Sequence, residues 1–80
     1  MLMTFYVRHL RHIMDRAGAE PSYRNKLLCD EAAREALGME KAHADEVWEK
    51  VRKLLQGPEK ERKEFEDKTV KILSRKLITG

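Results

Sequence analysis

The sequence predicts an all-α fold, a compact bundle of four helices joined by short connections. Apolar residues recur at intervals of three and four along most of the chain, which is the spacing of one buried face of an α-helix. Four glycines follow these apolar stretches, and glycine commonly ends a helix because it adopts the left-handed conformation without strain. The expected helices cover about residues 2–17, 21–37, 40–56 and 58–78.

The chain has 80 residues, enough for one small core and too few for two, so we expect residues 1–80 to form a single helical domain. Hydrophobic residues make up 41% of it and charged residues 39%, a balance typical of a folded domain. The lone cysteine, Cys29, cannot form an internal disulfide, which favours a reducing compartment, most simply the cytoplasm. No apolar stretch is long enough to cross a bilayer, so no membrane partner is expected.

The third expected helix has the clearest apolar face and contains the only tryptophan, Trp48. The second has small residues, among them Ala32 and Ala33, at the centre of a broad apolar arc. Small residues let neighbouring helices approach closely, so we expect this helix to be central. The predicted core consists of Leu10, Ile13, Leu27, Val47, Trp48, Val51, Leu54, Leu55, Phe65, Ile72, Leu73 and Leu77.

Residues that hold metals or act as nucleophiles occur without the partners that such chemistry needs. His9 and His12 are one helical turn apart, but a zinc site needs at least three protein ligands. Glu40 and His43 form one Glu-x-x-His motif, whereas a two-metal bundle needs two. Cys29 has alanines at helical spacing, an apolar setting that makes a thiol inert. We therefore predict a protein that is not an enzyme, with no catalytic residue, cofactor, metal site or small-molecule substrate.

Two basic surfaces are candidates for contact with nucleic acid or with an acidic partner. If folding brings them together, they form a phosphate-binding face. Alternatively, they serve mainly to keep the protein in solution. Their members are Arg8, Arg11, His12 and Arg16 on the first helix and Lys68, Lys71 and Arg75 on the last.

The second and third helices, with a turn at Gly38 between them, also have the order of a helix-turn-helix motif. In that motif the exposed residues of the second helix contact DNA. Here those residues are mostly acidic and would be repelled by phosphate, which argues against the motif. They are Asp45, Glu46, Glu49 and Lys50.

Residues 12–22, HIMDRAGAEPS, resemble the first helix and loop of archaeal histone-fold proteins, in which a basic amphipathic helix ends in an Ala-Gly-Ala turn. That fold continues with one long uninterrupted helix, whereas Gly38 ends the second helix here. The sequence is therefore assigned to no family.

These observations favour a small non-enzymatic helical binding module that acts through protein–protein contacts. Its expected role is that of an adaptor, regulator or assembly factor, with another protein or a second copy of itself as partner. Apolar residues outside the main helical faces, Leu2, Phe5 and Ile78 together with Met1, are the candidate contact patch. The alternative is a nucleic-acid-binding accessory protein that uses the basic faces of the first and last helices.

Overall fold

The computed structural model describes residues 5–79 and confirms the predicted all-α fold of four helices. A short 3₁₀ helix precedes the first of them and continues directly into it. The elements are η1 (Phe5–Leu10), α1 (Arg11–Ala17), α2 (Tyr23–Leu37), α3 (Ala44–Leu55) and α4 (Glu59–Thr79).

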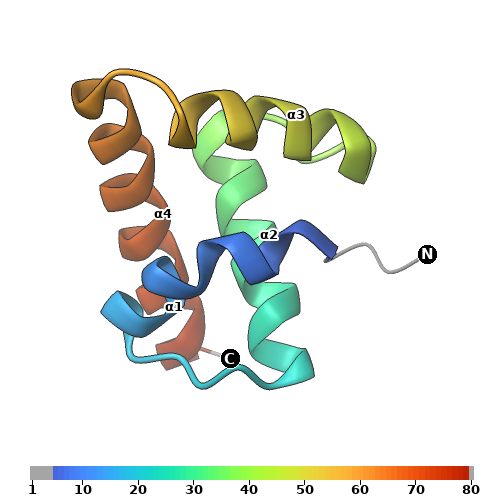
Figure 1. Ribbon diagram of the computed structural model, residues 1–80. Helices are drawn as coiled ribbons and strands as arrows, with labels where there is room; N and C mark the ends of the chain where they lie inside the picture. The colour runs from blue at the N-terminus through green and yellow to red at the C-terminus, as the bar shows by residue number, and fades with distance from the viewer. Residues whose placement is uncertain (1–4, 80) are drawn as a thin grey trace.

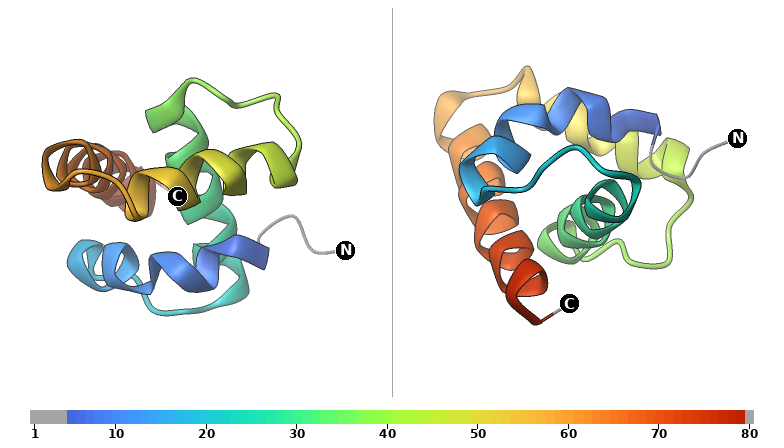
Figure 2. Two further views of the ribbon diagram at one scale, coloured as in Figure 1. Left: turned by 45° about the horizontal axis from the view of Figure 1, so that its top comes forward. Right: turned by 90° about the horizontal axis from the view of Figure 1, so that it is seen from below.

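The longest helices, α2 and α4, run in opposite directions in Figure 1, cross steeply as Figure 2 shows, and make the most extensive packing contact of the fold. Lys76 of α4 reaches across this interface to Glu35 and Glu31 of α2, with its Nζ 3.4 Å from Glu31 Oε1. The segment η1–α1 crosses in front of α2 and packs against α4, while α3 lies across the end of the pair. Both views in Figure 2 show η1–α1 and α3 running side by side.

Residues from η1 and all four helices meet in one hydrophobic core. Most of the predicted core residues belong to it or pack against it, with Trp48 and Leu54 half-buried at its edge. Leu27 is an exception, because it is half-buried on α2 and lies outside this cluster, where its neighbour Leu28 packs instead. The largest fully enclosed side chains of the described residues are Tyr6, Val7, Leu10, Ile13, Met14, Cys29, Val47, Val51, Thr69 and Leu73.

The predicted helix over residues 2–17 is wrong in its first part, where residues 5–10 form a 3₁₀ helix; residues 2–4 lie outside the described chain. Val7, Leu10 and Ile13 are nevertheless all buried. They are spaced three apart, and a 3₁₀ helix has three residues per turn, so the tighter winding keeps them on one side. The apolar spacing therefore predicts the buried face correctly and the helix type incorrectly.

The third helix was expected from residue 40 and begins at Ala44. The preceding residues are held as a loop by Arg34, whose Nη1 donates to the backbone carbonyls of Glu40 and Ala42. These two bonds attach the connection that precedes α3 to a buried side chain of α2.

Within residues 5–79, no helix combines the length and the apolar character needed to span a membrane. The longest, α4, has 21 residues, many of them charged.

Candidate functional site

The basic residues of α1 face acidic residues of α4. His12 Nε2 lies 2.7 Å from Glu66 Oε2, and Arg16 Nη2 donates to Asp67 Oδ1 at 2.7 Å. Glu66 is buried at this interface, while Arg16 and Asp67 are about half exposed. Two of the four residues of the predicted basic face, His12 and Arg16, are therefore paired with acidic side chains of α4.

The remaining predicted cations lie at the surface. Arg8 is exposed, and Arg11 forms a loose pair with Asp15 at 3.5 Å in which both side chains are more than 60% exposed. Three cations share an exposed stripe of α4 and make no ion pair within the part of the chain that the structure describes: Lys68, Lys71 and Arg75. The structure thus shows a cationic stripe without ion pairs on α4, beside the helix α1 whose His12 and Arg16 are paired with Glu66 and Asp67.

The predicted apolar patch is not assembled from the members that the structure describes; Met1 and Leu2 lie outside the described residues. Phe5 is half-buried, packs against the core and meets Tyr6 edge-on, with ring centroids 5.9 Å apart. Ile78 is 85% exposed near the end of α4. The start of η1 and the end of α4 lie apart in both Figure 1 and Figure 2, so these two residues do not form a common surface.

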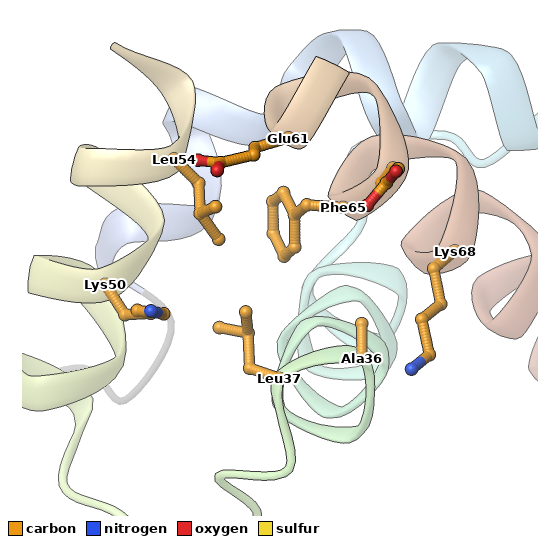
Figure 3. Close-up of a pocket in the computed structure, with 8 residues that line it drawn as sticks. Ala36, Leu37, Lys50, Leu54, Glu61, Phe65 and Lys68 are labelled. Atoms are coloured by element: carbon orange, nitrogen blue, oxygen red, sulfur yellow. The ribbon is translucent and has the colours of Figure 1, made fainter. Parts of the chain in front are cut away.

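A groove between α2, α3 and α4 is a candidate contact surface of the described chain (Figure 3). Its volume is about 340 Å³, and its floor consists of apolar side chains from all three helices. Four charged side chains surround this floor. The floor is Ala36, Leu37, Leu54 and Phe65, and the charged rim is Lys50, Glu61, Glu64 and Lys68.

The groove depends on helical spacing and on the way three helices meet. On α4, Glu61, Phe65 and Lys68 stand four and three residues apart, so they share one helix face. On α3, Lys50 and Leu54 are likewise four residues apart. α2 ends beside them, because Gly38 adopts the left-handed conformation with φ of 69° and terminates the helix.

None of the four rim charges makes an ion pair within residues 5–79. By contrast, Glu49 and Lys53 on the outer face of α3 pair with each other at 3.6 Å. An apolar centre bordered by exposed charges has the layout of a protein-contact surface, in which a desolvated centre is surrounded by a polar rim, although lysine and glutamate are less common in such interfaces than elsewhere on protein surfaces.

Comparison of the chain with family models, with curated proteins and with solved structures found no match.

A buried polar cluster, not foreseen from the sequence, lies at the centre of the molecule. The Tyr6 hydroxyl donates to Asp30 Oδ1, and Arg34 Nε donates to both Asp30 carboxylate oxygens at 3.0 and 3.1 Å. Burial and the hydrogen bond to Asp30 raise the pKa of Tyr6 well above its usual value. Arg34 Nη2 is buried without a hydrogen-bond partner among the described residues. The available signal was the i, i+4 spacing of these two opposite charges within the broad apolar arc of α2.

Trp48 was expected in the core but has an additional neighbour at the surface. The exposed His9 ring stacks on its indole with centroids 4.6 Å apart and planes at 18°. Tyr6 stacks at 6.4 Å and 21°. These rings join η1 to α3, which makes them a structural element of the fold.

Cys29 is fully buried, and burial, assisted by the charge of Asp30, raises the pKa of its thiol to about 12. A thiol of this kind stays protonated and is a poor nucleophile. Among the residues that the structure describes, no three His, Cys, Asp or Glu side chains are grouped so that they could hold a metal ion.

Proposed function

We propose that this chain is a small non-enzymatic binding module that acts through protein–protein contacts at the groove between α2, α3 and α4. The supporting observation is an apolar floor formed by the half-buried Leu37 and Leu54 together with the buried Phe65, bordered by four charges without ion-pair partners in the described chain. Burial of such a floor by another protein supplies the hydrophobic free energy of association. The unpaired rim charges add orientation and specificity. The single buried thiol is consistent with a reducing compartment, and we propose the cytoplasm.

The lining of the groove is more suitable for a protein surface than for catalysis. Its described side chains are four apolar residues, two lysines and two glutamates. Each of the charged ones is exposed, and a solvated charge is not tuned for proton transfer in the way that a buried one is.

A second candidate function, binding of nucleic acid as an accessory protein, is supported by the stripe of Lys68, Lys71 and Arg75 on α4. Three phosphate contacts give weak, strongly salt-dependent binding. Replacing Lys71 and Arg75 by Glu should then abolish the shift of a DNA or RNA probe at low salt. If the unmodified protein shifts neither probe, this alternative is excluded.

The main proposal is tested by photo-crosslinking in the cells that produce the protein. Lys50, on the groove rim, is replaced by a diazirine-bearing lysine analogue that keeps the ammonium charge. The control places the same analogue at Lys60, which is exposed on α4 but does not line the groove. We expect irradiation to give a discrete protein adduct from position 50 and little from position 60.

Equal adducts at both positions, or none at position 50, would contradict the proposal. The mass of the adduct also identifies the occupant, because a second copy of the chain doubles the mass and any other protein gives a different one.

A further inference from the structure

The helix α3 differs from the other helices in how it is attached to the fold. α2 and α4 are joined by Lys76, which reaches Glu31 and Glu35, and α1 is joined to α4 by the pair of Arg16 and Asp67. No side chain of α3 forms an ion pair or a hydrogen bond with another element in the part of the chain that the structure describes. The side chains of α3 are therefore attached by apolar and aromatic contacts alone.

Few side chains make this attachment. Only Val47 and Val51 of α3 are buried, while Trp48, Leu54 and Leu55 are half-buried against the core. The packing of α3 against α4 is also much less extensive than that of α2 against α4. Elements with few buried apolar contacts are those that open locally while the rest of a protein stays folded.

Aromatic stacking connects α3 to η1. The His9 ring lies on the indole of Trp48 with centroids 4.6 Å apart, and the Tyr6 ring lies at 6.4 Å. η1 itself is held on α2, because Tyr6 is buried and its hydroxyl donates to Asp30. The stack thus joins a helix without polar links to a segment that has one.

α3 also forms one wall of the groove. Its Leu54 lies beside Phe65 of α4, and its Lys50 stands at the rim (Figure 3). Phe65 is only 6% exposed, so the groove as it stands offers a partner little apolar surface. Displacement of α3 would remove this wall and expose Phe65, together with Val47 and Val51 on the inner side of α3.

We infer that α3 is a lid on the groove and that the stack of His9 on Trp48 is its latch. The structure shows the lid closed, and the open lid presents the apolar surface that a partner protein needs. A partner that binds only the open state must supply the free energy of opening, so the latch lowers the affinity of the groove. The inference rests on the proposed function and adds regulation to its site, but the opening of α3 belongs to the free chain and is measurable without a partner.

Native-state hydrogen exchange of the unmodified chain and of His9→Ala tests the lid. A 12-residue helix without tertiary packing is marginal in water, so the amides of α3 exchange when it opens. In the unmodified chain we expect them to exchange at least about tenfold faster than the slowest amides of α2 and α4. His9→Ala should accelerate the α3 amides by a further factor of about two to ten, the worth of one aromatic pair, and leave those of α2 and α4 unchanged.

The matched control is Arg11→Ala. Arg11 is exposed just after η1, and its ion pair is with Asp15 of its own helix, so this variant should leave the exchange of α3 unchanged. His9 is itself exposed, and far-UV circular dichroism verifies that its replacement keeps the fold. If His9→Ala does not fold, the comparison of α3 with α2 and α4 in the unmodified chain still decides whether α3 opens separately.

Amides of α3 that exchange as slowly as those of α2 and α4 overturn the inference, because α3 then opens only when the whole chain unfolds. So does an equal acceleration of all the helices by His9→Ala, since the stack then stabilises the fold as a whole and latches nothing. Either result leaves the proposed contact at the groove in place, because the crosslinking experiment decides that separately.

Discussion

Asp30 and Arg34, one turn apart on α2, form an ion pair that is 5% and 6% exposed. Arg34 Nε donates to both carboxylate oxygens, and its Nη1 reaches the carbonyls of Glu40 and Ala42 before α3. Because Tyr6 of η1 donates to the same carboxylate, this pair connects three separate parts of the chain. The charges of α2 thus organise the inside of the bundle.

Replacing Asp30 by Ala should lower the free energy of unfolding by about 3–5 kcal/mol, because it leaves the guanidinium of Arg34 buried without a counter-charge. Urea unfolding followed by far-UV circular dichroism measures this. The double variant D30L/R34M removes both charges and should be less destabilised than D30A. If D30A unfolds at the same urea concentration as the unmodified chain, the pair does not stabilise the fold.

Replacing Tyr6 by Phe removes one donor from Asp30 while keeping the ring, so we expect a loss of about 1–3 kcal/mol in the free energy of unfolding. The matched control is Tyr23→Phe, since Tyr23 is 66% exposed at the start of α2. That variant should stay within about 0.5 kcal/mol of the unmodified chain. Equal effects of the two substitutions would show that the hydroxyl of Tyr6 has no special contact.

The thiol of Cys29 should resist modification in the folded protein, because burial raises its pKa to about 12. A thiol reagent at about pH 8 is expected to react slowly with the native chain and rapidly in urea, where an ordinary thiol pKa of about 8.5 returns. Absorbance of the released chromophore follows the reaction. Rapid labelling under native conditions would mean that Cys29 is accessible.

The same pKa difference predicts a loss of stability in alkali. The Cys29 thiol stays neutral in the folded state but ionises in the unfolded state. Its contribution to the free energy of unfolding is therefore complete below about pH 8.5 and is lost as the pH rises toward about 12. The unfolded state binds fewer protons in this range, and the free energy of unfolding falls by up to about 1.4 kcal/mol per pH unit. The free energy of unfolding, measured with urea, should decline more steeply with pH for the unmodified chain than for Cys29→Ala, which lacks the thiol. Parallel declines would refute the assignment.

Gly38 ends α2 with φ of 69°, and a Cβ at this position would have no atom within 4 Å. The cost of Gly38→Ala is therefore that of the backbone conformation alone, about 1 kcal/mol in the free energy of unfolding. Asn tolerates the left-handed conformation better, so Gly38→Asn should cost less. Thermal unfolding of the two variants compares them, and an Ala variant as stable as the parent would contradict the argument.

The helices and most of the core could be predicted from local spacing, and the groove could not. Leu10, Val47, Val51 and Leu73 belong to apolar faces that repeat within single helices, and all four are fully buried. The floor and rim of the groove come from α2, α3 and α4 together. A residue such as Phe65 shows in the sequence only that it is apolar, and not which helices it meets.

The basic residues show most clearly the difference between what the sequence determines and what the tertiary structure determines. By itself the sequence determined that α1 is basic, that α4 is acidic first and basic later, and that glycines separate the helices, because these are properties of neighbouring residues. The tertiary structure alone decided that α1 packs on the acidic half of α4, where His12 and Arg16 find Glu66 and Asp67 at separations of 54 and 51 residues. Pairing across such distances depends on how the apolar faces dock, and helical periodicity specifies the faces without specifying which of them meet.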